Sequence, residues 1–259
     1  MLTLRVRRAV AEWLRRRSQS TATSALFVLV LLAPCTATAQ RKLPADSFPP
    51  PSRPVSSIVA PRWIAEDRRD AFGETDAVIR ALRIRRGQVV ADIGAGDGYY
   101  VAKLAPLLGD SGRVLAVDIE PRYLAMLRRR VADAEWRNVQ VIEGVPHDPT
   151  LPDARVDVAL MIHMYHEIEQ PFGLLYHLAT AMKADGLVGV LDADAPTDRH
   201  GTPPRLLRCE MEAMGYRFVR REMLADGAYL AIFRAPTPVA KLTSAGAVRS
   251  AVQAARCRP

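Results

Sequence analysis

Two carboxylates and three glycines lie close together in this chain, in an order that suits a cationic ligand. The carboxylates are Asp92 and Asp118, and the glycines, which follow Asp92 closely, are Gly94, Gly96 and Gly98. Glycines allow positive φ angles and bring a backbone close to a ligand. An anionic phosphate favours a helix N-terminus without neighbouring carboxylates. The residue types therefore predict a nucleoside-like ligand that is cationic and lacks phosphate.

The spacing of the glycines separates two cofactor classes. A dinucleotide site typically has the order G-x-G-x-x-G. Here the order is G-x-G-x-G, and Tyr99 stands where the third glycine of that pattern would be. The spacing therefore disfavours an NAD-dependent oxidoreductase, which stays open as an alternative.

The elements that must position these residues alternate along the chain. Apolar runs predict strands over residues 89–93, 114–117, 138–144, 156–162, 187–191, 216–222 and 228–233. Apolar residues at helical spacing predict helices after the glycines and over residues 121–131, 171–182 and 203–214. Strands that alternate with helices form parallel βαβ units, so we expect a doubly wound α/β fold.

The segment VVADIGAGDGYYVAKLA, followed by VLAVDIE, resembles motif I of class I S-adenosylmethionine-dependent methyltransferases. The resemblance continues in order over residues 63–234 and is to the small-molecule type, here in an exported variant. It implies a Rossmann-like, seven-stranded, mostly parallel sheet with an antiparallel last strand, for which the short link 224–227 is suited. It also implies S-adenosylmethionine as the cofactor.

The resemblance assigns roles to the residues around the glycines. Asp92 would lie near the methionine amino end of the cofactor, and Gly94, Gly96 and Gly98 would pass beneath it. Asp118 would accept hydrogen bonds from the two ribose hydroxyls. Many family members also carry an acid just after the third-strand glycine to bind adenine.

Two further cofactor contacts are predicted, and each has an alternative interpretation. The adenine-binding position of the family is Val145 here, so Asp148 or a backbone carbonyl would substitute. The ring of Tyr99 would pack over the cofactor. The alternative for the tyrosine pair at Tyr99 and Tyr100 is ordinary packing of a helix on the sheet.

The loop after the fourth predicted strand carries the groups most able to act on an acceptor. It reads His163-Met164-Tyr165-His166-Glu167 and holds two of the five histidines of the chain. We expect His166 to be the general base, with His163 as a second candidate and Tyr165 or Glu167 as substrate contacts. The alternative is that both histidines are structural. The order H-x-x-H-E lacks the H-E-x-x-H spacing of helical zinc sites, so no metal is predicted.

A second polar loop, residues 192–204, follows the fifth predicted strand. Asp192, Arg199 and His200 are predicted substrate contacts in a lid or acceptor pocket. The alternative is a solvated loop in which Asp198 or Thr202 caps the next helix.

The distribution of charge argues against a nucleic-acid partner. The chain has 259 residues and a net charge of +8, but residues 1–39 contribute +5 and residues 235–259 contribute +4. The region between them is therefore close to neutral and lacks the basic surface that phosphate backbones require.

The two ends predict an exported protein. Arginines, the apolar run 25–33 and Ala37-Thr38-Ala39 are typical of a cleavable signal peptide over residues 1–39, with Gln40 as the new N-terminus. A proline-rich linker or arm (40–62), the methyltransferase domain (63–234) and a flexible basic tail (235–259) would follow. The prediction is a periplasmic or secreted protein without stable membrane insertion, in preference to a membrane-anchored or cytoplasmic one. A Cys209–Cys257 bridge is conceivable.

The leading hypothesis is methyl transfer from S-adenosylmethionine to a small-molecule acceptor. The cofactor is made in the cytosol, which raises a second hypothesis: an exported S-adenosylmethionine- or nucleoside-binding protein without catalysis. The sequence predicts neither the acceptor nor the oligomeric state.

Overall fold

A computed structural model describes residues 42–58, 66–224, 227–236, 242 and 244–258. The predicted signal segment, residues 1–39, lies outside the described residues. The same is true of Trp63, at the predicted start of the domain. The fold below is that of the unit from Gln40 to Pro259.

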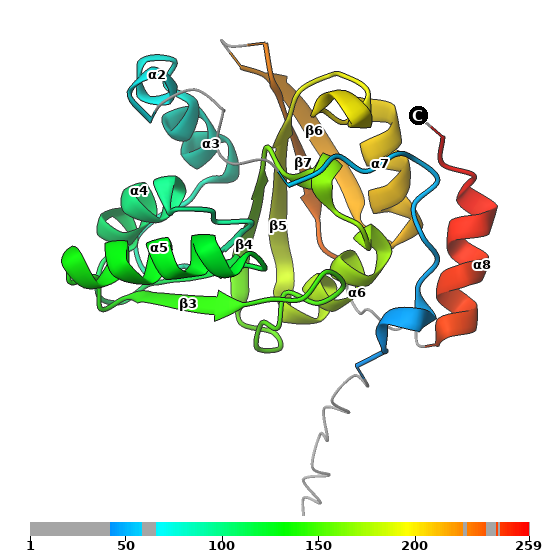
Figure 1. The fold of residues 1–259 in the computed structure, drawn as a ribbon, viewed down its shortest axis with the longest axis horizontal. Helices are drawn as coiled ribbons and strands as arrows, with labels where there is room; N and C mark the ends of the chain where they lie inside the picture. The colour runs from blue at the N-terminus through cyan, green and yellow to red at the C-terminus, as the bar shows by residue number, and fades with distance from the viewer. Residues whose placement is uncertain (1–41, 59–65, 225–226, 237–241, 243, 259) are drawn as a thin grey trace, which may run out of the picture. The chain divides into compact units, whose positions relative to one another are not determined.

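A seven-stranded sheet forms the centre of this unit (Figure 1). Its strands are β1 (Val89–Ile93), β2 (Arg113–Asp118), β3 (Val139–Glu143), β4 (Val156–Ile162), β5 (Met182–Asp192), β6 (Arg217–Met223) and β7 (Tyr229–Arg234). The order across the sheet is β3-β2-β1-β4-β5-β7-β6. Neighbours from β3 to β5 are parallel, and β7 is antiparallel to both β5 and β6. The predicted doubly wound fold with an antiparallel last strand is confirmed.

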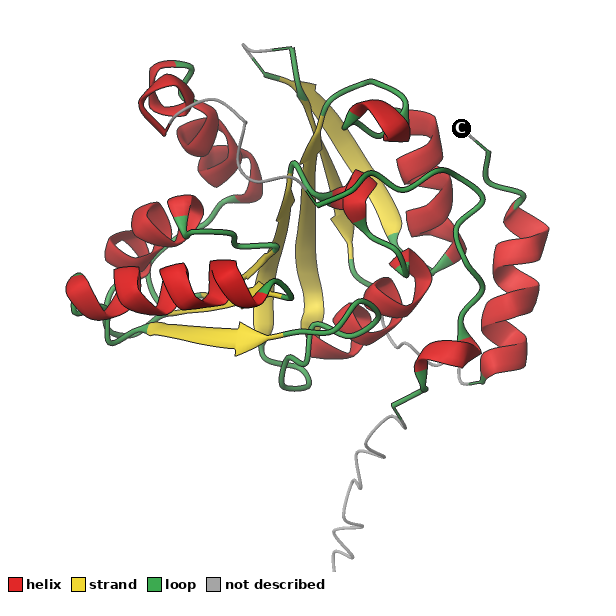
Figure 2. Ribbon diagram, viewed as in Figure 1, coloured by secondary structure: helices red, strands yellow, loops and turns green. Residues whose placement is uncertain are grey.

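Helices cover both faces of the sheet (Figure 2). They are α2 (Glu66–Ala71), α3 (Glu74–Leu82), α4 (Tyr99–Leu108), α5 (Pro121–Asp133), α6 (Pro171–Ala181), α7 (Pro204–Ala213) and α8 (Ala245–Ala255). Short 3-10 turns are η1 (Ala45–Ser47), η2 (Tyr165–Glu167) and η3 (Thr197–Arg199).

The alternation of side chains along each strand divides the core in two. In β1, Val90 packs with α3 and α4, whereas Ala91 and Ile93 pack with the elements on the other face. Successive side chains of a strand point to opposite faces, so a strand buried on both sides reads as a continuous apolar run. This explains why β1 and β4 have the bounds predicted from their sequence.

The chain changes direction across the sheet between β1 and β4. From β1 it winds outward through β2 to β3, and from β4 it winds the other way through β5. Loops beyond the carboxyl ends of the strands diverge at such a point and leave a crevice, which is where open α/β sheets bind ligands. Asp92 and Asp118 lie at this edge.

The proline-rich arm is bound to the domain by buried contacts. Arg53 is buried and its Nε lies 3.2 Å from Oε1 of Glu210 in α7. Phe48 is also buried, with its ring centroid 5.4 Å from that of Tyr176 in α6. The described part of the arm, residues 42–58, therefore packs on the face formed by α6 and α7.

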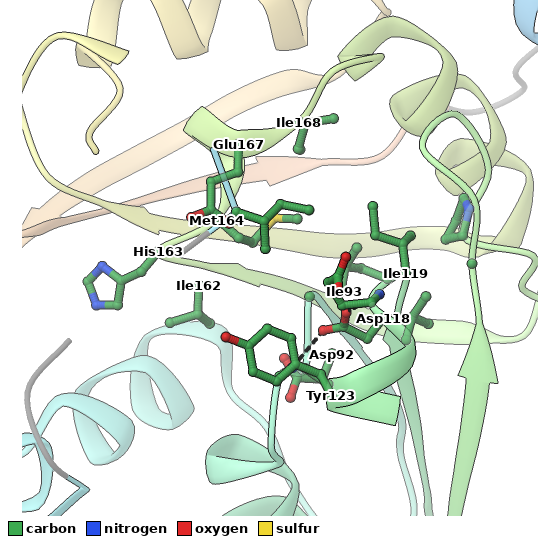
Figure 3. Close-up of a pocket in the computed structure, with 18 of the residues that line it drawn as sticks. Asp92, Ile93, Asp118, Ile119, Tyr123, Ile162, His163, Met164, Glu167 and Ile168 are labelled. Carbon is green, nitrogen blue, oxygen red and sulfur yellow. Dashed lines mark hydrogen bonds between the residues drawn. The ribbon is translucent and has the colours of Figure 1, made fainter. Parts of the chain in front are cut away.

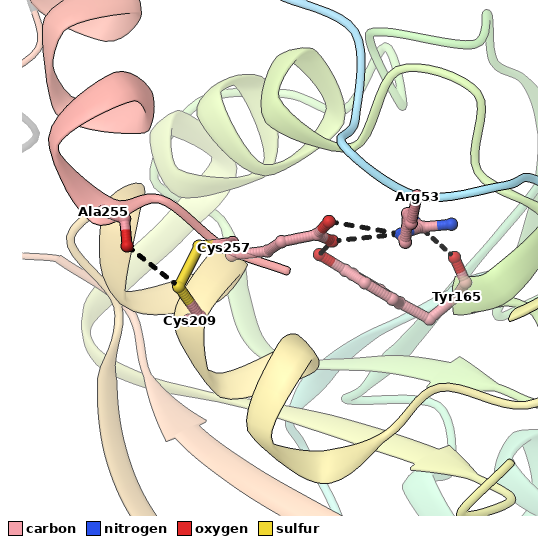
Figure 4. Close-up of a disulfide and its surroundings, with 6 residues drawn as sticks. Arg53, Tyr165, Cys209, Ala255 and Cys257 are labelled. Carbon is pink, nitrogen blue, oxygen red and sulfur yellow. Dashed lines mark hydrogen bonds and ion pairs between the residues drawn. A yellow bond between two sulfur atoms is a disulfide. The ribbon is translucent and has the colours of Figure 1, made fainter. Parts of the chain in front are cut away.

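The C-terminal segment differs from its prediction. A flexible tail was expected over residues 235–259, but Ala245–Ala255 forms α8, with Val248 and Val252 buried. Cys257 forms a disulfide with Cys209 of α7, and their Cα atoms are 5.5 Å apart (Figure 4). The prediction of a flexible tail is therefore wrong for this segment, because a covalent bond and an apolar face hold it.

Among the described residues, none of the helices has both the length and the apolar character needed to cross a membrane.

Candidate active site

A cavity of about 410 Å³ opens at the carboxyl ends of β1, β2 and β4. Its polar wall includes Asp92, Asp118 and His163, and much of the rest is apolar. Figure 3 shows Asp92, Asp118 and Tyr123 on one side and His163 on the other. Cavities of this size that combine an apolar lining with a few polar groups are typical of small-molecule sites.

Asp92 places a buried carboxylate at the wall of this cavity. The residue is 2% exposed, and within the described part of the chain its Oδ2 has no hydrogen-bond partner. Burial raises the pKa of Asp92 to about 7; the charge of Arg69 opposes this shift, and that of Asp118 adds to it. A buried carboxylate without a partner is costly. A cationic ligand beside Asp92 would compensate this cost.

Asp118 organises the glycine turn. Its Oδ2 accepts a hydrogen bond from Gly96 N at 2.8 Å, and its Oδ1 accepts one from Glu120 N at 2.9 Å. A carboxylate has about four lone-pair positions, so two remain for a ligand. The side chain is thus fixed in place with acceptor capacity facing the cavity, which suits a pair of hydroxyl donors.

Gly94 brings the turn close to the loop after β4. Its φ is +74°, and a Cβ atom built there would lie 2.9 Å from Cγ of Met164. Gly94 and Gly96, both predicted cofactor contacts, line the cavity. Gly98 lies outside the lining and precedes the first residue of α4. Its predicted role as a ligand contact is not supported.

Asp148 is engaged elsewhere. Its carboxylate accepts a hydrogen bond from Lys42 Nζ at 2.9 Å and one from Thr150 N at 2.7 Å, and it lies outside the lining of the cavity. The prediction that Asp148 binds adenine is therefore not supported. The cavity wall at this end is apolar and includes Val145, Pro146 and Pro149.

Tyr99 lines the cavity but is bound by its neighbours. Its hydroxyl accepts a hydrogen bond from Thr75 at 2.9 Å and donates one to Asp70 at 2.8 Å. The guanidinium of Arg69 lies 3.9 Å from the ring centroid. Arg69 also lines the cavity, so α2 contributes a side chain to the site.

His163 is the histidine that faces the cavity. It follows β4, and its Nε2 lies 3.1 Å from Oε2 of Glu74 in α3. Burial raises the pKa of Glu74, but the hydrogen bond and charge of His163 and the charge of Arg69 outweigh it and lower that pKa to about 2. Glu74 is therefore ionised at neutral pH and orients the imidazole of His163.

His166, the predicted base, is placed differently. It is fully buried and lies outside the lining of the cavity, with Nδ1 3.0 Å from Oδ1 of Asp192. Asp192 is equally buried, so its predicted role as a substrate contact becomes that of a partner to His166. Of the two predicted base candidates, His163 lines the cavity and His166 does not.

The remaining predicted contacts divide into one that reaches the cavity and three that do not. Glu167 lines it. Tyr165 is buried and donates a hydrogen bond to Oε2 of Glu210 at 2.9 Å. Arg199 is exposed, and the ring of His200 lies against that of His166, with 5.5 Å between the centroids. Thr202 donates its hydroxyl hydrogen to Asp192 rather than capping α7.

Many residues of the cavity lining were not predicted from the sequence as ligand contacts. Ile58 from the arm, Tyr123 from α5 and Met164 are among them. Tyr123 stands five residues after the second-strand acid Asp118, whereas Ile58 comes from a segment that no motif connects to the site.

Comparison with known proteins agrees with the geometry. Residues 91–188 match a family model described as a methyltransferase domain. A ubiquinone/menaquinone biosynthesis C-methyltransferase of Coxiella burnetii is 28% identical over 123 residues, which cover 47% of this chain and 49% of that protein. A protein-L-isoaspartate O-methyltransferase of Methanothrix thermoacetophila is 37% identical over 81 residues, or 30% of this chain and 39% of that protein. The chain thus spans half or less of the length of these relatives.

The fold has a solved counterpart. A structure described as a SAM-dependent methyltransferase from Aquifex aeolicus superposes with a TM-score of 0.59 and 19% identity. It covers 67% of this chain and all of that one.

Proposed function

We propose that this chain, a member of the class I S-adenosylmethionine-dependent methyltransferase family, transfers a methyl group from that cofactor to a small-molecule acceptor. The observation that carries the proposal is the buried carboxylate of Asp92, whose Oδ2 has no hydrogen-bond partner among the described residues. It lies in one cavity with Asp118 and the glycine turn.

The residues present fit the cofactor along its length. Asp92 would face the cationic methionine end, and the free acceptor positions of Asp118 would take the ribose hydroxyls. The apolar wall at Val145, Pro146 and Pro149 would enclose the adenine. When bound, the cofactor supplies an electrophilic methyl group on a sulfonium.

The acceptor side of the cavity is mainly apolar. Ile58, Ile162, Met164 and Ile168 line it, together with His163 and Glu167. Such a lining favours a small molecule with an apolar body and one nucleophilic hydroxyl or amine. The same walls exclude water and hold the nucleophile in line with the methyl group, which is most of what this displacement requires.

His163 is the proposed general base. In this proposal Nε2–H of His163 donates to Oε2 of Glu74, 3.1 Å away, and Nδ1 is the nitrogen that takes up a proton. Methyl transfer would then form the bond from methyl carbon to the acceptor oxygen or nitrogen and break the bond from methyl carbon to sulfur. The proton of the acceptor would pass to Nδ1 of His163.

The test is a transfer assay with methyl-labelled S-adenosylmethionine and a panel of phenols, quinols, amines and thiols. The His163→Ala variant is expected to lose about 10²- to 10⁴-fold in turnover with cofactor affinity unchanged. His147→Ala, outside the cavity lining, serves as the control. Full activity of the His163→Ala variant would remove His163 from the reaction.

We also propose that the domain works outside the cytoplasm. Its Cys209–Cys257 disulfide supports this, because disulfides persist in oxidising compartments. The basic and apolar segment before Ala39 supports it as well. Fractionation of an expressing bacterium, with mass spectrometry of the mature N-terminus, should find the protein beginning at Gln40 outside the cytoplasm; a cytoplasmic protein with free thiols would contradict the proposal.

A further inference from the structure

Three metal-binding side chains converge beside the cofactor cavity. His166 and Glu167 come from η2, and His200 comes from the loop after η3. One potential ligand atom from each lies within 4.8 Å of the other two. Two imidazoles and one carboxylate form a ligand set that divalent transition metals use.

The orientation of His166 is the observation that distinguishes this cluster from a chance grouping. Its Nδ1 lies 3.0 Å from Oδ1 of Asp192, a carboxylate that also accepts hydrogen bonds from Thr202 Oγ1 at 2.7 Å and Ala193 N at 2.9 Å. A carboxylate in this position fixes the proton on Nδ1 and leaves the lone pair on Nε2. Metal-binding histidines are typically held in this way.

The other nitrogen of His166 points into the cluster. His166 is fully buried, and in the described part of the chain its Nε2 has no hydrogen-bond partner. It lies 3.8 Å from Oε1 of Glu167. Two ligand atoms at about 2.1 Å from a tetrahedral ion are about 3.4 Å apart. The pair therefore needs a shift of only a few tenths of an ångström to share an ion.

A tight loop brings His200 to the same place. Thr202 N donates a hydrogen bond to Ala193 O at 2.9 Å, and a Cβ atom on Gly201 would lie 2.7 Å from that same oxygen. The tight turn between Ala193 and Thr202 thus requires glycine at position 201. It sets the ring of His200 edge-on to that of His166.

We propose that His166, Glu167 and His200 bind one divalent transition-metal ion, with Asp192 as the positioning residue. Three protein ligands leave a coordination position open. Because Glu167 also lines the cofactor cavity, that position would face the space for the acceptor. This inference goes beyond the proposed function, which requires no metal.

The test uses tag-free full-length protein, stripped with a chelator and dialysed against limiting Zn²⁺ or Co²⁺, without cofactor. We expect one equivalent of metal per chain by elemental analysis, and a Co²⁺ absorption spectrum typical of four or five ligands. Glu167→Gln and His200→Ala are expected to lose this binding. Asp192→Asn should weaken it about 10- to 100-fold, as loss of an outer partner does.

His147→Ala is the matched control, because it removes a histidine outside the cluster and should bind metal like the wild type. The proposal is overturned if the wild type binds no more metal than Glu167→Gln, or if Glu167→Gln and His200→Ala keep wild-type affinity. Circular dichroism of each variant identifies those that fail to fold, and Glu167, at the cavity wall, is the substitution with least effect on the core. If no metal binds, the proposed cofactor binding and methyl transfer are not contradicted, because separate assays measure them.

Discussion

The chemistry of the site depends first on one residue, Asp92. Its folded pKa of about 7 lies above the unfolded value of 3.8, because burial disfavours its charged form. The folded protein therefore holds this proton more tightly, and the contribution of Asp92 to stability falls as pH rises from about 4 to 7. A cationic ligand reverses the preference, since it favours the ionised carboxylate.

This gives a prediction for the pH dependence of binding. Affinity of the wild type for S-adenosylmethionine should rise by about tenfold per pH unit below pH 7 and level off above it. Asp92→Asn should bind more weakly without that slope, while its unliganded form becomes more stable at pH 8. Titration calorimetry and thermal melts between pH 5.5 and 8.5 measure both the affinity and the stability.

Asp97→Asn is the control for this experiment, since it removes a carboxylate from the same turn. It should keep the slope of the wild type. A slope that persists in Asp92→Asn would place the titrating group elsewhere.

The sequence predicted some of these residues because they stand in a local motif. Asp92, Gly94, Gly96 and Asp118 lie within 27 residues and line the cavity. The predictions that failed depended on the direction of a side chain or on contacts between residues far apart in the sequence. Sequence spacing did not reveal that His166 turns toward Asp192 and His163 toward the cavity, or that Glu74, 89 residues before His163, orients it.

At the scale of elements, the arm is attached through a buried ion pair. Arg53 and Glu210 have almost no exposed side-chain surface. Arg53 also donates hydrogen bonds to the carbonyl of Tyr165 (Figure 4) and to that of His166. Burial raises the pKa of Glu210, and the charge of Arg53 opposes the shift. The arm thus supports η2, whose Glu167 lines the cavity.

Breaking this pair should be costly. Arg53→Ala is expected to lower the free energy of unfolding by about 3 to 5 kcal/mol, because it leaves a buried carboxylate uncompensated. The double variant Arg53→Met with Glu210→Leu should recover most of the loss. Denaturant unfolding measures both, and Arg208→Ala, from an exposed pair with Glu212, should cost less than about 1 kcal/mol. Equal stability of Arg53→Ala and the wild type would contradict this account of the arm.

The disulfide should be the main support of α8. It joins residues 48 positions apart, for which chain entropy gives about 4 kcal/mol of stabilisation. Cys209→Ser is expected to lower the melting temperature, and a reducing agent should bring the wild type down to the same value. Cys257→Ser is the matched control and should behave identically. A wild-type melting temperature that reductant does not change would show that the disulfide contributes little to stability.

Elements with a full apolar pattern were predicted well, and those held by distant contacts were not. β1 and β4 have the predicted bounds because both of their faces are buried. β5 starts at Met182, five residues earlier than predicted, where Met182 pairs with Val156 beyond a register shift. An isolated helix as short as α8 is marginal in water, so its stability comes from tertiary contacts that local sequence does not reveal.

At the scale of the whole molecule, the order of strands and helices was predictable because it follows from the alternation of patterns and from right-handed crossovers. The fold brings Asp92 of β1, Asp118 of β2 and His163 after β4 to one edge of the sheet. The same fold supports many reactions, so the proposed methyl transfer rests on this group of residues rather than on topology.

The measurement that tests the central claim most directly is calorimetric titration of S-adenosylmethionine and its demethylated product into the wild type and Asp118→Ala. The account predicts one site in the wild type for each ligand. Loss of a charge-assisted hydrogen bond in Asp118→Ala should weaken binding by about 1.5 to 3 kcal/mol, or roughly 10- to 150-fold. Glu143→Ala, an exposed acid on the neighbouring strand, should bind like the wild type. Absence of binding by both ligands, or unchanged affinity in Asp118→Ala, would contradict the account.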